Sequence, residues 1–274
     1  MIEIDLQQQK QIMIDILIKI DEFCNKNNIN YFLADGTMIG AARHKGFIPW
    51  DDDIDIIMPR PDYELFIKKF PGSYENLSLA TPYDEFPLYY YVKVYDRRTL
   101  KIEEIDYGIH KPFGIDIDVF PIDGESDRYD RFIKDFYKRK KILDTYCRII
   151  AYRDNRECSF KQKIKNIVVE TWKKMFAPDI KDLIKKYNRL ATKYDYNSSA
   201  YVGELSVYGG KTSRHKKEIF NDYALVEFEG YKFRAPIDYK TYLTDKYGDY
   251  MKLPPENERI THHNYKAYWK DSNL

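Results

Sequence analysis

The chain has 274 residues, 43% of them hydrophobic and 16% aromatic, which is enough to bury a sizeable core and excludes a disordered chain. Its 45 basic residues nearly balance its 44 acidic ones, giving a net charge of +1, so a global electrostatic surface for nucleic acid is excluded. No window approaches 18 apolar residues, and the first twenty residues lack the pattern of a signal peptide. We therefore expect a cytoplasmic protein. The odd number of cysteines, without a Cys-x-x-Cys spacing, indicates reduced thiols at Cys24, Cys147 and Cys158.

The N-terminal third of the chain predicts alternating helices and strands. Apolar residues at intervals of three and four predict an amphipathic helix over 5–27. A short apolar strand over 31–34 and a Gly turn then lead into a short helix that ends near residue 42. After a loop, alternation of polar and apolar residues predicts a strand over 53–58, and a helix over 59–70 follows it.

The rest of the chain is predicted to be strands, then helices, then a hairpin. The expected elements are further strands at 77–80, 89–95, 99–106 and 114–119, a helical block over 126–196, a hairpin formed by 224–228 and 231–233, and a short helix near 238–247. Strands that come before a helical block favour an α+β fold over a regular series of βαβ units.

Two of the predicted strands carry carboxylates on one face. Residues two apart in a strand project to the same side, so Asp51, Asp53 and Asp55 are expected to share a face, with about 7 Å between successive residues. The same spacing recurs at Asp116 and Asp118. Carboxylates that converge repel each other unless a cation neutralises them, and oxygen ligands suit Mg²⁺ or Mn²⁺. The alternative is a solvated acidic turn.

A Gly turn and several basic residues lie near the first carboxylate strand in the sequence. Gly36 and Thr37 open a predicted helix, where exposed backbone N–H groups can bind an anion such as phosphate. Arg43 and Lys45 follow this helix and Arg60 follows the strand, so these side chains are candidates for binding phosphate oxygens or a carboxylate.

These residues together resemble the LicD family of phosphocholine and related phosphotransferases. The resemblance rests on the Gly-Thr turn, on Arg-His-Lys-Gly-Phe-Ile-Pro-Trp-Asp-Asp-Asp-Ile-Asp at 43–55, and on Met-Pro-Arg-x-Asp-Tyr at 58–63. Asp-Val-Phe-Pro-Ile-Asp at 118–123, Phe-Glu-Gly at 228–230 and the segment 247–255 extend it over most of the chain. It is weakest over 124–200.

The resemblance implies a fold and a set of site residues. The fold is α+β, with a nucleotidyltransferase-type mixed sheet, flanking helices and a helical insertion, like the palm of DNA polymerase beta. Asp53, Asp55 and Asp118 are implied as catalytic metal ligands, with Asp116 as a fourth candidate. The roles of Asp51 and Asp52 stay open.

The resemblance also implies a donor site and a reaction. Gly36 and Thr37 are implied to contact the donor phosphates. From their positions in the sequence, Arg43, Lys45 and Lys93 are further candidates for donor binding, the alternative being that they are surface or strand-edge charges. A CDP-linked donor would give up phosphocholine, or a related group such as ribitol phosphate, to a hydroxyl of a cell-surface glycan or of its lipid-linked precursor. CMP would be released, with Mg²⁺ or Mn²⁺ as cofactor, and no nucleic acid would take part.

Three segments are expected within one continuous structural unit. They are a nucleotidyltransferase-like catalytic core over 1–125, a helical lid or acceptor region over 126–200, and a C-terminal hairpin and helix over 201–274 that pack back on the core. Residues 128–174 hold fifteen Lys or Arg against six Asp or Glu. This block is either a helical lid with a solvated basic rim, or a surface that meets an anionic acceptor or the inner face of the membrane.

Two other functions stay open from the sequence. A metal-dependent glycosyltransferase also uses Asp-x-Asp, but it would place a parallel-sheet nucleotide domain before the motif and release a nucleoside diphosphate. A non-catalytic nucleotide-binding relative would show no turnover with any donor.

Overall fold

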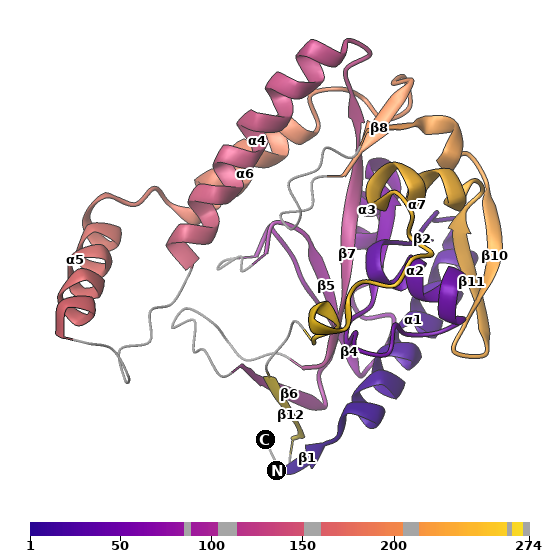
Figure 1. The fold of residues 1–274 in the computed structure, drawn as a ribbon, viewed down its shortest axis with the longest axis horizontal. Coiled ribbons are helices and arrows are strands. Elements are labelled where there is room, and N and C mark those ends of the chain that lie inside the picture. The colour runs from indigo at the N-terminus through magenta and orange to yellow at the C-terminus, as the bar shows by residue number, and fades with distance from the viewer. Residues whose placement is uncertain (85–88, 104–113, 151–159, 205–213, 262–264, 271–274) are drawn as a thin grey trace.

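A mixed sheet lies at the centre of the computed structural model (Figure 1), which describes residues 1–84, 89–103, 114–150, 160–204, 214–261 and 265–270. Its strands run in the order β2-β3-β7-β5-β4, with β8 paired to the far part of β7 and β9 paired to β8. The bounds are β2 Phe32–Leu33, β3 Asp55–Pro59, β4 Leu77–Ala80, β5 Val92–Asp96, β7 Asp116–Glu125, β8 Tyr201–Gly203 and β9 His215–Lys216. Only β3 and β7 run parallel; the other pairs of this sheet are antiparallel. The predicted α+β class is confirmed.

Strand β7 is longer than the sequence predicted, because the prediction ended it before Pro121. A proline cannot donate to a ladder and is uncommon inside a central strand. Pro121 pairs with Met58 on the β3 side, whereas β5 pairs with β7 only up to Val119 and β8 begins to pair at Asp123. The missing N–H of Pro121 therefore falls in the gap between two ladders and interrupts neither.

Three helices lie beside the sheet in the N-terminal part of the chain, as predicted. They are α1 Leu6–Asn27, α2 Asp35–His44 and α3 Arg60–Lys69. Helix α1 begins with a capping box in which Asp5 accepts from the backbone of Gln8 and the Gln8 side chain accepts from the backbone of Asp5. It ends at Asn28 in the left-handed conformation, with φ of 53°.

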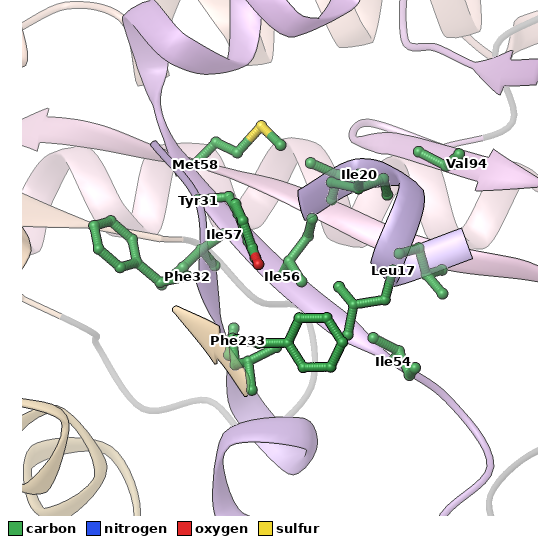
Figure 2. Packing of buried hydrophobic residues seen from close by; sticks show 14 of the residues in the cluster. Leu17, Ile20, Tyr31, Phe32, Ile54, Ile56, Ile57, Met58, Val94 and Phe233 are labelled. Atoms are coloured by element: carbon green, nitrogen blue, oxygen red, sulfur yellow. The ribbon is translucent and has the colours of Figure 1, made fainter. Parts of the chain in front are cut away.

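The core lies between these helices and the sheet (Figure 2). Leu17 and Ile20 of α1 are fully buried, as are Ile54 and Ile56 at the start of β3. The alternation predicted for the first carboxylate strand is therefore confirmed on its apolar side, because its isoleucines face the core. Phe233 of the C-terminal hairpin enters the same cluster.

The middle of the chain is helical, as predicted, with α4 Tyr129–Ile150, α5 Phe160–Phe176 and α6 Ile180–Ala191. Helices α4 and α6 share a second apolar cluster that includes Phe136, Leu143 and Tyr187. Arg139, which the sequence places in a basic run, is not on the surface: it is 3% exposed and pairs with buried Glu125. Helix α5 stands apart from the α4–α6 pair (Figure 1).

The C-terminal part returns to the core. Its elements are the 3₁₀ turn η1 Lys217–Phe220, the hairpin β10 Tyr223–Phe228 and β11 Tyr231–Pro236, α7 Tyr239–Tyr247, the turn η2 Glu256–Glu258 and β12 Tyr265–Trp269. Strand β12 joins β1 Ile2–Ile4 to β6 Thr99–Glu103 in a separate sheet. The hairpin and α7 confirm the sequence prediction, whereas β1, β8, β9 and β12 were not predicted. The predicted strand end at 104–106 and the Cys158 thiol lie outside the described residues.

Within the described part of the chain, no helix combines the length and the apolar character that crossing a bilayer requires.

Candidate active site

The carboxylates of the two predicted strands meet across the sheet. In the parallel pair β3–β7, Asp55 lies in register with Asp118, and on the other side of β7 the residue opposite Asp118 is Lys93 of β5. Three adjacent strands thus place acid, acid and base in one row across the sheet. The sequence predicted the carboxylates of Asp55 and Asp118. The position of Lys93 opposite Asp118 follows from the antiparallel register of β5, which the sequence did not predict.

Lys93 neutralises the acidic pair on β7. Its ammonium donates to Asp116 at 2.6 Å and also to Asp118, and Lys101 donates to the other oxygen of Asp116 at 3.0 Å. Burial alone would raise the pKa of Asp116, but Lys101 and Lys93 outweigh it and hold that pKa at about 2. Burial would likewise lower the pKa of Lys93, yet Asp116 and Asp118 keep it well above its ordinary value. Lys93 is therefore charged at neutral pH.

Burial is the largest influence on the pKa values of Asp51, Asp55 and Asp118, and it raises all three. Burial, followed by the charges of Asp53 and Asp35, raises the pKa of Asp55 well above its ordinary value. Burial raises the pKa of Asp118 as well, against the opposing effect of Lys93. Burial and the neighbouring Asp53 raise the pKa of Asp51 to about 7. Repulsion among these groups is the electrostatic signature of a site that attracts cations.

A small pocket of about 20 Å³ opens beside these groups, lined by Asp52, Asp53, Ile54, Lys93, Lys101, Asp116, Asp118 and Tyr265. Its oxygen donors have the chemistry that Mg²⁺ and Mn²⁺ prefer. Among the described residues, however, no group of three or more acidic, His or Cys side chains is arranged to hold a metal ion. Asp116 is engaged by two lysines and Asp118 by one, so the binding of a cation by Asp53, Asp55 and Asp118 stays a prediction.

The Gly-Thr turn supports the carboxylates directly. The Thr37 hydroxyl is buried and accepts a hydrogen bond from the Asp55 backbone N–H at 2.8 Å, which fixes the start of β3 against α2. A Cβ on Gly36 would lie 2.6 Å from a carboxylate oxygen of Asp51. The close approach that requires glycine at this position is therefore an approach of Asp51 to the start of the helix. Binding of donor phosphate by this turn stays a prediction.

The basic residues of the motif contact other parts of the chain. Arg43 donates to the carbonyl oxygen of Tyr250 at 2.9 Å, and Lys45 is largely exposed and forms an ion pair with Glu227 at 3.4 Å. Their predicted donor contacts stay untested. Arg60 does bind a carboxylate, since its guanidinium donates to both oxygens of Asp123 at 2.6 and 2.8 Å. This buried pair joins α3 to β7.

A second buried network, which sequence reasoning missed, adjoins the carboxylate row. The ammonium of Lys246 contacts both Asp35 and Glu204, and the Tyr247 hydroxyl also donates to Asp35. Asp35 has a φ of 45°, an uncommon conformation for a residue other than glycine. Its charge contributes to the raised pKa of Asp55, so the network borders the site. The signal available in the sequence was the C-terminal segment that begins at Tyr247.

A mixed sheet that presents carboxylates from neighbouring strands beside a Gly-Thr helix start is the arrangement expected of a nucleotidyltransferase-type domain. Consistent with this class, residues 28–143 match the family described as LicD/FKTN/FKRP, nucleotidyltransferase domain. The chain is 32% identical over 278 aligned residues to the lipopolysaccharide cholinephosphotransferase LicD of Haemophilus influenzae, covering 97% of this chain and 98% of that protein. The chain belongs to the LicD family.

Two proteins of Rickettsia species are similar to shorter parts of the chain. An uncharacterised protein of Rickettsia prowazekii is 40% identical over 63 residues, or 23% of each chain. One of Rickettsia typhi is 44% identical over 52 residues, covering 19% of this chain and 17% of that protein.

Proposed function

We propose that this protein transfers phosphocholine, or a related phospho-alcohol group, from a CDP-linked donor to a hydroxyl of a cell-surface glycan or its lipid-linked precursor. The observation that carries the proposal is the carboxylate row Asp55–Asp118, which lies within a chain related over nearly its full length to a lipopolysaccharide cholinephosphotransferase. The acceptor oxygen forms a bond to the phosphorus of the transferred group, the bond from that phosphorus to CMP breaks, and CMP leaves. We place the reaction in the cytoplasm, at the inner face of the membrane.

The residues of the row have distinct tasks in this proposal. Phosphoryl transfer requires positioning and charge neutralisation more than covalent help from the protein. Asp118 lies between β3 and β5 and is assigned to accept the proton of the attacking hydroxyl, a role that its raised pKa suits. Lys93 holds Asp118 in place and supplies positive charge near the leaving nucleotide.

We further propose that Asp53, Asp55 and Asp118 hold Mg²⁺ or Mn²⁺. The support is the chemistry of these oxygen donors, together with the burial and the mutual repulsion that raise the pKa of Asp55. A bound divalent cation would neutralise donor phosphate oxygens and lower the pKa of the acceptor hydroxyl. A metal-dependent glycosyltransferase, the alternative that also uses Asp-x-Asp, would release a nucleoside diphosphate instead.

Release of CMP from CDP-choline tests the proposal. The wild type with Mg²⁺ should release CMP, and Asp55→Ala and Asp118→Ala should lower the rate by about 10²-fold or more while the fold is retained. Asp130→Asn, which changes an exposed carboxylate on α4, is the matched control and should keep the wild-type rate. Full turnover in EDTA, or release of a nucleoside diphosphate from a sugar nucleotide instead, would overturn it.

A further inference from the structure

Helix α5 has its apolar side facing outward. The exposed fractions of Ile167, Val168, Trp172 and Met175 lie between 52% and 68%. These residues recur at helical spacing and so lie along one side of the helix. Asn166, on the opposite side, is only 2% exposed.

This polarity is the reverse of that of an ordinary surface helix, whose apolar side packs inward. Helix α6 shows the usual arrangement, since Leu183, Ile184 and Tyr187 are buried in the cluster it shares with α4. On α5 the least exposed side chains are polar instead: Glu170 accepts from Lys173 at 2.8 Å, and the Lys173 side chain is only 11% exposed. An apolar surface that stands out in this way marks a site of interaction.

The charge of α5 identifies the kind of partner. Residues 160–176 contain five lysines and one acidic residue, Glu170, which is paired within the helix. Lys161 and Lys165 are exposed and lie on the same side as Val168 and Trp172, nearer the N-terminal end of the helix. An apolar stripe that includes Trp and is flanked by lysines suits the boundary between acyl chains and anionic headgroups. A second copy of α5 would bring lysines against lysines.

We propose that α5 docks the protein on an anionic lipid bilayer, lying in the plane of the interface with Ile167, Val168, Trp172 and Met175 inserted. The 17-residue helix does not meet the requirement for a span, so it lies on the membrane rather than crossing it. The inference deepens the proposed function, on which it rests for its purpose, because a lipid-linked acceptor is presented at such a surface.

Cosedimentation of the full chain with lipid vesicles tests this docking. The wild type should bind vesicles of phosphatidylcholine and phosphatidylglycerol, and Ile167→Ser/Val168→Ser should lower the partition coefficient about tenfold or more. The pair Leu225→Ser/Ile237→Ser, which alters comparably exposed apolar residues of the hairpin and its flank, is the matched control and should bind like the wild type.

Two further measurements test the contribution of the lysines and the insertion of Trp172 separately. Lys161→Gln/Lys165→Gln should reduce binding to the anionic vesicles roughly tenfold without changing the weak binding to pure phosphatidylcholine. The emission of Trp172 should shift to shorter wavelength on binding, a change that Trp172→Phe removes.

CMP release from CDP-choline with a soluble acceptor keeps this inference distinct from the proposed function. The α5 variants should retain it, since they leave the carboxylate row intact. A wild type that binds vesicles but releases no CMP would refute the proposed function and leave the docking in place. A wild type that ignores anionic vesicles, or a dimer that Ile167→Ser/Val168→Ser dissolves in the absence of lipid, would overturn the docking.

Discussion

At the scale of single residues, the buried carboxylate of Asp51 lowers the stability of the folded protein when it is charged. Its pKa of about 7 in the folded protein lies above the ordinary 3.8, so the folded state binds more protons than the unfolded state between these values. Stability therefore falls as the pH rises through this window. One pKa unit corresponds to about 1.4 kcal/mol, and relaxation in solvent offsets part of the shift.

Asp51→Asn removes this cost. Without added metal at pH 8, we expect the variant to be about 1 to 2 kcal/mol more stable than the wild type, with the gain disappearing toward pH 4. Urea unfolding at several pH values checks this. A gain that does not depend on pH would show that the buried charge of Asp51 is not its source.

Substitution of Gly36 separates two reasons for a glycine at this position: the close approach of Asp51 and the binding of donor phosphate. Because its Cβ position lies against Asp51, Gly36→Ala should displace that carboxylate, and its cost in stability should largely vanish in an Asp51→Ala background. If the turn also binds donor phosphate, Gly36→Ala should weaken the affinity for CDP-choline in both backgrounds. Calorimetry and thermal melts of the four proteins give the two readouts. An affinity equal to wild type would contradict the phosphate-binding role.

At the scale of elements, the hairpin β10–β11 supports the loop that leads to the carboxylates. Glu229, at its tip, accepts from the Phe47 backbone N–H at 2.9 Å and donates its own N–H to the Lys45 carbonyl at 2.8 Å. A Cβ on Gly46 would clash with the Glu229 side chain. The motif over 43–55 and the Phe-Glu-Gly turn, nearly two hundred residues apart, are thus two halves of one contact.

Glu229→Ala should therefore lower stability by about 1 kcal/mol and lower the rate of CMP release, because the Phe47 N–H loses its acceptor. Glu229→Gln keeps an acceptor oxygen and the same φ of 51°, so it should stay close to the wild type. Thermal melts and initial rates compare the two variants. Equal losses in both would assign the effect to charge rather than to the hydrogen bond.

Periodicity in the sequence predicted the elements that form this part of the fold. Apolar spacing located α1, proline and glycine residues bounded α3 and the hairpin, and alternation placed Asp55 and Asp118 on strands that prove to be neighbours. Strands β1 and β12 were not predicted, because each is short and they pair with each other from opposite ends of the chain. Their stability comes from long-range pairing, which leaves no local pattern.

At the scale of the whole molecule, the network around Lys246 joins three distant segments. Asp35 precedes the Gly-Thr turn, Glu204 follows β8, and Lys246 lies in α7, while the Tyr242 hydroxyl donates to Glu204 at 3.1 Å. A lysine and two acids, more than forty residues apart in sequence, show no spacing that links them. Only the folded chain reveals that the C-terminal part closes over the start of the site.

Replacing Lys246, the cation that Asp35 and Glu204 share, should destabilise the packing of the C-terminal part over the site. Lys246→Met leaves two carboxylates buried without their cation, and we expect a loss of about 3 to 5 kcal/mol at pH 8. Burial already raises the pKa of Glu204, against the lowering effect of Lys246, so its pKa rises further in the variant. The folded variant then takes up a proton before the unfolded chain does, and the deficit shrinks as the pH falls.

Thermal melts at pH 8 and pH 5 measure both the deficit and its pH dependence. Lys240→Met, on the exposed side of the same helix, is the control and should change stability by less than about 0.5 kcal/mol. Lys246→Met/Glu204→Gln should recover part of the loss at pH 8, because one of the two unpaired charges is gone. A Lys246→Met protein as stable as the wild type at pH 8 would show that the C-terminal part is held over the site by its apolar contacts alone.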